Sequence, residues 1–292
     1  MSIPTEQSLA RFLESPTRFL FFTGKGGVGK TSLACASAIA LADAGRRVLL
    51  VSTDPASNLD EVLGVCLTSM PTGVPTVPRL AALNIDPSSA TAAYREKLVG
   101  PYRGKLPESI LRGMAEQLSG ACTMEIAAFD EFSKLLGEPA STADFDYVIF
   151  DTAPTGHTLL LLDATESYHR EIARKASNLP DEVRRLLPRL RDGDFTRVLV
   201  ITLPEATPVH EAAALQADLR RAGIEPFAWV INQSFAGSGS HDPLIVARAR
   251  GEVPFIREVV EKHSKQTAIV PWVTDEPVGH ERLQQLFKIH SP

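Results

Sequence analysis

The eight-residue run GKGGVGKT, residues 24–31, constrains the fold of this chain more than any other feature. It satisfies the pattern G-x-x-x-x-G-K-[ST], and it stands between a short apolar run at 18–23 and a small-residue segment at 30–44. A strand before such a run and a helix after it are the context that identifies a P-loop. The glycines let the backbone approach a phosphate, and the N-terminus of the helix adds positive potential. The sequence therefore predicts a strand, a phosphate-binding loop and a helix in this order.

Three side chains of this run have separate expected roles. Lys30 is predicted to contact the β- and γ-phosphates of a nucleotide, and the Thr31 hydroxyl is predicted to bind Mg²⁺. Lys25 departs from the general pattern, because it is a second lysine directly after the first glycine. One interpretation of Lys25 is a solvated lysine near the phosphates. A second interpretation depends on the resemblance described below.

Short apolar runs alternate with longer helical patterns along the chain. Beyond residues 18–23, we predict strands at 47–53, 80–86, 145–150, 197–202, 226–231 and 267–270. These runs are continuous and rich in Val, Ile and Leu, which is typical of a parallel sheet covered on both faces. Their alternation with helices indicates a doubly wound, mostly parallel α/β fold of the P-loop NTPase type. We expect a single domain over residues 1–292, with a helical insertion at about 88–138.

Two aspartates follow predicted strands, at the edge of the sheet where open α/β folds bind ligands. Asp54 could orient an attacking water or hold Mg²⁺, and an N-cap of a following helix is the alternative. Asp151 has the position of the acid that binds Mg²⁺, directly or through water, in P-loop NTPases. It begins the run DTAPTGHT, in which Gly156 suits a segment that moves when the γ-phosphate leaves.

Charge and composition exclude several classes of protein. The net charge of −5 and the absence of a basic excess argue against a nucleic-acid partner. The three cysteines, Cys35, Cys66 and Cys122, are odd in number and widely spaced, which fits a reducing compartment better than a disulfide framework. Neither a signal peptide nor an apolar run of about 18 residues is found. We therefore expect a cytoplasmic protein, whose membrane contact would go through a partner.

Four longer runs make the sequence similar to one family. They are GKGGVGKTS, STDPASNLDEVLG, GACTMEIAAFDEF and DTAPTGHTLLLLDATESYHREIARK, and weaker likeness extends over residues 21–283. The chain resembles the arsenical pump-driving ATPases, the ArsA family, which are soluble subunits of arsenite efflux pumps. The DTAPTGHT run is shared with a sister family, the ATPases that target tail-anchored membrane proteins. The segment around Cys122 favours the arsenical branch.

The resemblance implies an ATP- and Mg²⁺-dependent hydrolase that responds to As(III) or Sb(III) and drives their extrusion through a membrane permease. Familiar members contain two fused halves, whereas this chain has one P-loop, so a homodimer is implied. Lys25 would then cross the interface to the partner's nucleotide and neutralise charge in the transition state. Further implied partners are the permease itself, at the inner face of the membrane, and an arsenic metallochaperone.

The resemblance also assigns the metalloid-binding residues. As(III) and Sb(III) prefer thiolates, and by motif their ligands here are Cys122 and His157. His157 lies six residues after Asp151, so metalloid and nucleotide would bias the same segment. The chain lacks the additional cysteine that some relatives carry after DTAPTGHT, and it has Gly120 where some carry serine. A buried inert thiol and an ordinary loop histidine are the alternatives for Cys122 and His157.

Adenine contacts are placed by the resemblance at Asn232 and at residues 271–273. An asparagine amide accepts and donates at once, which suits the adenine edge, and a turn residue is the alternative. The predicted nucleotide-binding residues are Gly24, Gly26, Gly27, Val28, Gly29, Lys30, Thr31, Ser32, Asn232, Pro271, Trp272 and Val273. The predicted catalytic residues are Lys25, Lys30, Asp54 and Asp151, and the predicted Mg²⁺ ligands are Thr31, Asp54 and Asp151.

Two other functions stay open at this point. A targeting ATPase for tail-anchored membrane proteins requires a broad hydrophobic groove, typically rich in methionine. The chain has four methionines and no C-x-x-C pair that could join a dimer through zinc. An ATPase that partitions or assembles other proteins is the third candidate, and the Cys122 and DTAPTGHT segments argue against it.

Overall fold

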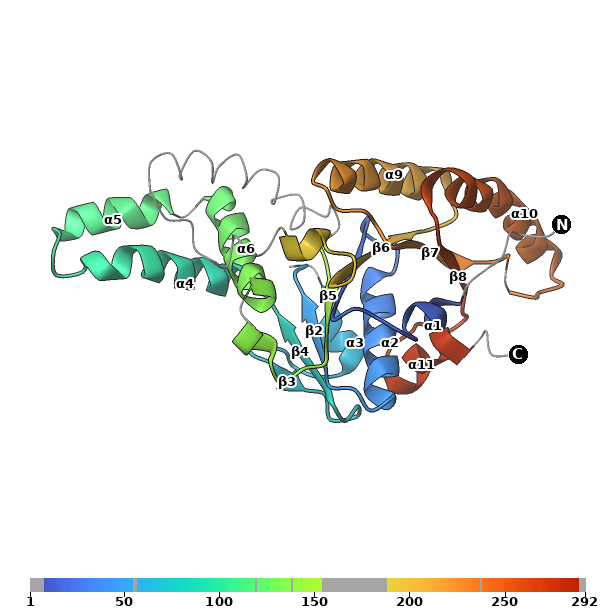
Figure 1. Cartoon of the computed structure of the whole chain (residues 1–292), viewed down its shortest axis with the longest axis horizontal. Coiled ribbons are helices and arrows are strands. Elements are labelled where there is room, and N and C mark those ends of the chain that lie inside the picture. Colours follow the sequence, from blue (N-terminus) through green and yellow to red (C-terminus); the bar gives the residue numbers. More distant parts are fainter. Residues whose placement is uncertain are drawn as a thin grey trace.

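The sheet of this protein is eight-stranded and mostly parallel, as Figure 1 shows. The computed structural model describes residues 8–54, 57–118, 120–137, 139–153, 188–236 and 238–288. The strands are β1 (Phe19–Gly24), β2 (Val48–Ser52), β3 (Thr72–Gly73), β4 (Leu80–Asn84), β5 (Tyr147–Asp151), β6 (Thr196–Thr202), β7 (Ala228–Ser234) and β8 (Thr267–Pro271). Their order is β3-β4-β2-β5-β1-β6-β7-β8, and every neighbouring pair is parallel except β3 and β4. The predicted fold class is confirmed.

Helices cover both faces of this sheet (Figure 1). They are α1 (Leu9–Phe12), α2 (Lys30–Asp43), α3 (Leu59–Leu63), α4 (Pro87–Val99), α5 (Glu108–Gln117), α6 (Ala121–Gly137), α9 (Ala206–Arg221), α10 (Pro243–Glu258) and α11 (His280–Lys288). Side chains of β1 alternate between two cores: Leu20 and Phe22 pack with α2, α3 and α11, whereas Phe19 and Phe21 pack with α6, α9 and α10. Among the helices of the described ranges, none combines the length and the apolarity needed to cross a bilayer.

The predicted strands are all present, with ends displaced by up to three residues. The largest displacement is in β7, which was expected to end at Ile231 and extends to Ser234. A register shift against β8 lies between these two residues. Strand β3 was not predicted, because two residues are too short to produce a periodic pattern.

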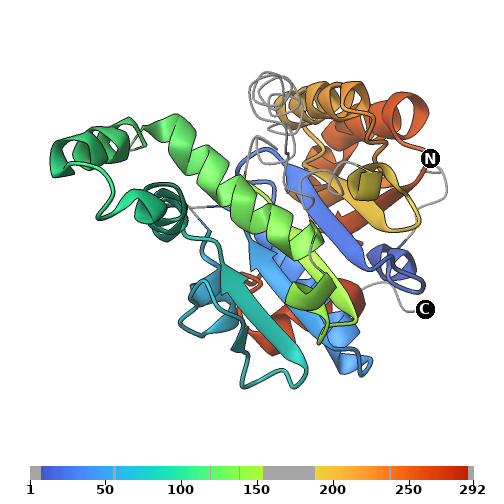
Figure 2. The same ribbon diagram turned by 60° about the vertical axis from the view of Figure 1, so that its left-hand side comes forward.

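Helices α4, α5 and α6, with the short turn η1 (Gly100–Tyr102), lie between β4 and β5 and form a helical arm. Helices α4 and α5 project from the body of the molecule (Figure 1), whereas α6 runs across one face of the sheet (Figure 2). The ring of Phe132 on α6 lies 5.7 Å from that of Phe21 and 5.1 Å from that of Phe150. This aromatic cluster fastens the arm to the sheet.

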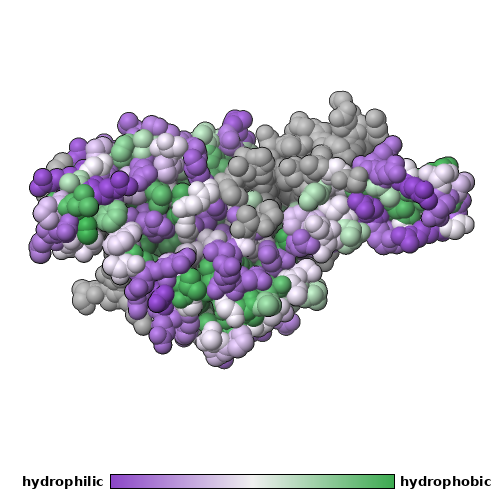
Figure 3. All heavy atoms as spheres, turned by 180° about the vertical axis from the view of Figure 1, so that it is seen from behind, coloured by the Kyte–Doolittle hydropathy of each residue, from purple (hydrophilic) through white to green (hydrophobic). Residues whose placement is uncertain are grey.

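The surface of the arm is mixed in character, with scattered hydrophobic side chains among hydrophilic ones (Figure 3). The exposed apolar residues of its helices include Leu98, Ile110 and Met124. Helix α5 buries Leu111 and leaves most of its other residues at least partly exposed. The arm is therefore held mainly through α6 rather than through its tip.

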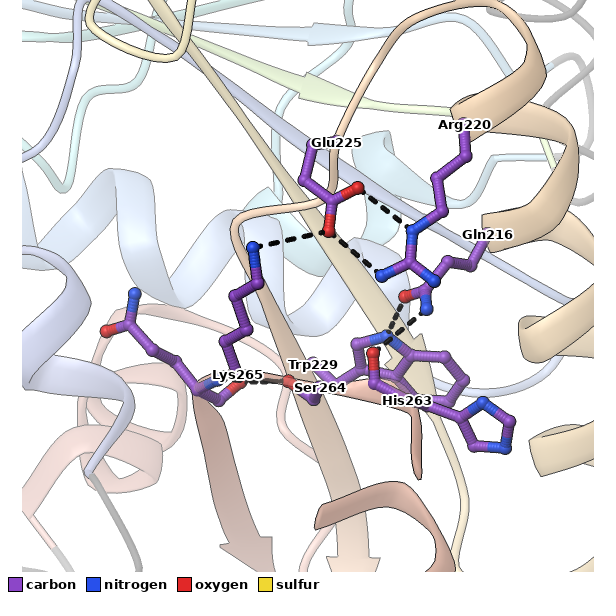
Figure 4. Close-up of polar contacts among 8 residues, drawn as sticks. Gln216, Arg220, Glu225, Trp229, His263, Ser264 and Lys265 are labelled. Atoms are coloured by element: carbon purple, nitrogen blue, oxygen red, sulfur yellow. Dashed lines mark hydrogen bonds and ion pairs between the residues drawn. The ribbon is translucent and has the colours of Figure 1, made fainter. Parts of the chain in front are cut away.

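A polar cluster joins α9 to β7 and to the turn before β8 (Figure 4). The indole N–H of Trp229 donates to Gln216 Oε1 at 2.5 Å, and Gln216 Nε2 donates to the backbone oxygen of His263 at 2.9 Å. Glu225 accepts two hydrogen bonds of 2.9 Å from Arg220. Since the indole and the amide are buried, their mutual hydrogen bond stabilises the start of β7, the strand that carries Asn232.

Replacing Phe132 by alanine is expected to lower the free energy of unfolding by about 3–5 kcal/mol, because a fully buried ring is lost from the contact between α6 and the sheet. Urea denaturation followed by far-UV circular dichroism measures this change. The control is Ile110→Ala on the exposed side of α5, which should cost less than about 1 kcal/mol. Equal losses in the two variants would contradict the role given to Phe132.

Candidate functional site

The loop between β1 and α2 is shaped by three glycines with positive φ: Gly24 at 153°, Gly27 at 80° and Gly29 at 87°. A Cβ on Gly24 would lie 2.3 Å from the backbone oxygen of Ile201 in β6. A Cβ on Gly29 would lie 2.2 Å from the side-chain nitrogen of Asn232. Both distances are shorter than any van der Waals contact, so the loop can sit this close to β6 and β7 only with glycine at these positions.

Lys30 is the first residue of α2, and its side chain is buried inside the loop. Its Nζ donates to the backbone oxygen of Lys25 at 3.0 Å. Burial lowers the pKa of Lys30, and the negative charges of Asp151 and Asp54 act against this change. A buried ammonium group at the N-terminus of a helix creates a positive potential that suits a phosphate.

The Thr31 hydroxyl donates a hydrogen bond of 2.7 Å to Asp151 Oδ2, at the end of β5. The Asp151 carboxyl is fully buried, and burial is the main cause that raises its pKa to about 6. The hydrogen bond from Thr31 and the charge of Lys30 act in the opposite direction. Within the described residues, the second carboxyl oxygen, Oδ1, has no hydrogen-bond partner. A buried carboxylate oxygen beside a hydroxyl is the kind of ligand set that fits Mg²⁺.

Asp54 lies just beyond the end of β2 and is almost fully buried. Its charge acts on both Lys30 and Asp151, so the structure brings the three predicted charged residues together. The alternative role as an N-cap is wrong for the next described helix, because α3 begins at Leu59 and its N-cap is Asn58. The site therefore contains two carboxylates around one ammonium group.

Lys25 points away from this group. Its Nζ lies 2.6 Å from Glu211 Oε1 on α9, and the two side chains are 40% and 47% exposed. The lysine is therefore neither solvated alone nor directed at the phosphate loop of its own chain. Sequence reasoning missed Glu211, because it lies 186 positions away and has no motif around it.

A cavity of about 270 Å³ lies beside the loop. Its lining residues are Ser32, Asn232, Gln233, Pro271, Trp272, Val273, Thr274, Asp275, Glu276, Pro277 and Leu286. All of the residues predicted to contact adenine are among them. The side-chain amide of Asn232 donates to the backbone oxygen of Val28 at 2.9 Å, which joins the cavity to the loop. Gln233, Leu286 and residues 274–277 were not predicted, because only their place in the fold brings them here.

The predicted metalloid ligands are placed only in part. Cys122 lies in the first turn of α6, the helix that follows α5 in the chain. His157 falls in the segment 154–187, outside the described residues. The metalloid site therefore stays a prediction.

These features define a P-loop nucleotide-binding domain. They are the glycine loop around the buried Lys30, the hydrogen bond from the Thr31 hydroxyl to Asp151 at the end of β5, and the adjoining cavity. The more specific assignment comes from comparison with known families. The anion-transporting ATPase family matches residues 17–179 and 163–290, and the chain belongs to this family.

Curated relatives agree with this assignment. An arsenical pump-driving ATPase of Acidiphilium multivorum is 41% identical over 288 residues, which cover 97% of this chain and 47% of the relative. One of Escherichia coli is 43% identical over 267 residues, covering 91% and 43%. The ATPase get3 of Schizosaccharomyces japonicus is 26% identical over 315 residues, covering 96% and 94%. The chain thus spans about half the length of the arsenical pump-driving relatives that it matches.

Asp151→Asn is expected to raise the free energy of unfolding of the nucleotide-free protein at pH 8. Folding raises the pKa of this carboxyl from 3.8 to about 6, so its ionisation lowers the free energy of unfolding. This loss grows between about pH 4 and pH 6 and is constant above about pH 6. Since one pKa unit corresponds to about 1.4 kcal/mol, the gain should be about 1–3 kcal/mol at pH 8 and vanish near pH 4. Urea denaturation at both pH values measures it.

The matched control for this experiment is Asp144→Asn, which removes an exposed carboxyl. This variant should change the free energy of unfolding by less than about 0.5 kcal/mol at either pH. A loss of stability in Asp151→Asn at pH 8 would show that the buried charge is balanced by its neighbours, and our account of the site would be wrong.

Proposed function

We propose that this chain hydrolyses ATP in response to As(III) or Sb(III) and drives an arsenite efflux system, acting in the cytoplasm at a membrane permease. The single observation that carries the nucleotide part is the convergence of Lys30, Thr31 and Asp151 at the start of α2. The metalloid part is supported by identities of 41–43% to arsenical pump-driving ATPases over more than nine tenths of this chain.

In the proposed reaction, the oxygen of a water molecule forms a bond to the γ-phosphorus while the bond to the bridging oxygen breaks. ADP leaves with that electron pair, and the proton of the water passes to phosphate or solvent. Lys30 neutralises charge on the β- and γ-phosphates, and Asp54 orients the water. Thr31, Asp54 and Asp151 would hold Mg²⁺, which supplies further positive charge when bound.

The adjoining cavity is proposed to bind the adenine base. The Asn232 amide donates one of its two N–H groups to the backbone oxygen of Val28, which fixes the orientation of the amide and leaves its oxygen to accept a hydrogen bond from a ligand. Adenine presents an amino group on its Watson–Crick edge, whereas guanine presents a carbonyl oxygen at the same position. This orientation of Asn232 supports a preference for ATP over GTP.

We further propose that two copies of this chain enclose the nucleotides. Within one chain, Lys25 is paired with Glu211 on the outer side of the loop. An exposed ion pair contributes about 0–1 kcal/mol, so Lys25 can leave it at little cost. In a symmetric pair, each Lys25 would reach the phosphates of the partner's nucleotide and stabilise the transition state.

The metalloid is proposed to act as the ligand that brings the two copies together. Cys122 from each chain would bind As(III) or Sb(III) as a thiolate and lose its proton, with His157 as a further ligand. His157 and Asp151 lie in the same segment, so metalloid binding would favour the hydrolysing state of the nucleotide site. A permease and a metallochaperone would be the remaining partners.

Targeting of tail-anchored membrane proteins is the second candidate. The relatives named ATPase get3 are 26–28% identical to this chain, compared with 41–43% for the arsenical pump-driving ATPases cited above. On the face that Figure 3 shows, the exposed apolar side chains of the helical arm lie scattered among hydrophilic ones. We therefore prefer the metalloid-linked function.

The rate of ATP hydrolysis with and without antimonite tests this proposal. We expect antimonite to stimulate the wild-type chain about fivefold or more. Cys122→Ser should lose the stimulation while keeping the basal rate, because serine does not bind soft metalloids. Cys66→Ser, on an exposed cysteine, is the control and should be stimulated normally. Absence of stimulation in the wild type, or normal stimulation of Cys122→Ser, would contradict the metalloid part.

A further inference from the structure

Strand β7 is irregular at the point where it borders the base cavity. Its register against β8 shifts between Ile231 and Ser234. Gln233 has φ of 55°, one of two non-glycine residues with positive φ among those described. Asn232 and Gln233, which lie inside the shift, both line the cavity. The irregularity therefore aims these side chains at the cavity, as β-bulges commonly do beside binding sites.

The chain that follows the bulge is held by one buried carboxylate, Glu252 of α10. Glu252 accepts hydrogen bonds from the Ser234 hydroxyl at 2.8 Å, from the backbone N–H of Phe235 at 3.0 and 3.2 Å, and from that of Ala236 at 3.3 Å. These two N–H groups lie beyond the end of β7. A buried carboxylate requires such donors, and the partly buried N–H groups of Phe235 and Ala236 find their acceptor in it, so each side depends on the other.

The same segment also fixes a second part of the cavity wall, next to Trp272. The backbone oxygen of Ser234 accepts a hydrogen bond of 2.9 Å from the N–H of Trp272. The rings of Phe235 and Trp272 lie 5.2 Å apart at 31°. Trp272 lines the cavity, whereas Glu252 does not. Through Ser234 and Phe235, Glu252 thus acts on both parts of the cavity wall without lining the cavity itself.

We propose that Glu252 is a positioning residue for base recognition, which holds the bulge of β7 and Trp272 so that the cavity selects adenine. This inference rests on the proposed binding of ATP at the P-loop with its base in the cavity. The grip on the phosphates does not involve Glu252, because Lys30 and Thr31 are positioned by Lys25 and Asp151. Loss of Glu252 should therefore weaken the contribution of the base to the binding free energy of ATP and leave the contribution of the phosphates unchanged.

The test compares three ligands, each with Mg²⁺: ATP, GTP and inorganic tripolyphosphate. Their dissociation constants are measured by titration calorimetry on the wild type, Glu252→Gln and Glu252→Ala. In Glu252→Ala, we expect ATP to bind about tenfold more weakly and the preference for ATP over GTP to fall, with tripolyphosphate changed less than about twofold. Glu252→Gln should have a smaller effect, because its amide oxygen still accepts from part of the segment.

Glu258→Gln is the matched control, because Glu258 lies on the same helix and faces His210 and His263, at 3.8 and 3.6 Å. It should bind all three ligands as the wild type does. If Glu252→Ala folds poorly, Ser234→Ala removes one of the donors and should lower the preference for ATP over GTP in the same direction. The change in tryptophan fluorescence on adding ATP should shrink in Glu252→Ala and Ser234→Ala and stay at the wild-type size in Glu258→Gln.

The possible failures are distinguishable. If the wild type binds ATP no better than tripolyphosphate, the assignment of the cavity to the base is wrong, and so is this inference. A wild type that prefers ATP, together with a Glu252→Ala variant that keeps the full preference over GTP, would overturn the role of Glu252 alone. Equal weakening of ATP and tripolyphosphate in Glu252→Ala would also overturn it, since a general structural role would then be sufficient.

Discussion

The hydrogen bond from Thr31 to Asp151 is the interaction on which the rest of this site depends. It joins the first turn of α2 to the end of β5, while Gly24 brings the start of the same loop against β6 on the other side of β1. The loop is thus fixed between β5 and β6, the two strands that flank β1. This arrangement buries Lys30 beside two carboxylates, and burial raises the pKa of Asp151, so ionisation of this carboxyl has a cost in stability. A phosphate and a divalent cation would offset that cost, so ligand binding and stability are linked in this site.

Within one chain, Lys30 is buried in the phosphate loop, whereas the second lysine of the motif, Lys25, lies half-exposed. Lys25 is bound to Glu211 on the surface, whereas its backbone oxygen holds Lys30 inside the loop. The two lysines of the motif therefore face different environments, one buried and one half-exposed. This division supports the proposed pairing of two chains, in which the exposed lysine serves the nucleotide of the partner.

Local patterns predicted much of the fold and the phosphate site, because strands, the glycine loop and Asp151 are each defined within a few residues. The end of β7 was misplaced, because a bulge depends on the partner strand and on Glu252 from a later helix. The pairing of Lys25 with Glu211 was also missed, since side chains far apart in sequence leave no periodic signal. The cavity lining was only half predicted for the same reason. Cys122 and His157 rest on the resemblance alone.

The claim that each nucleotide site needs a lysine from a second chain is tested most directly by mixing two inactive variants. Lys25→Ala can bind a nucleotide but has no Lys25 to offer to its partner. Lys30→Ala keeps Lys25 but cannot bind a nucleotide. The measurement is the rate of ATP hydrolysis, with antimonite, of each variant and of their equimolar mixture. Our account predicts that the mixture recovers activity, up to about a quarter of the wild-type rate for random pairing. A mixture no more active than the sum of its components would contradict it.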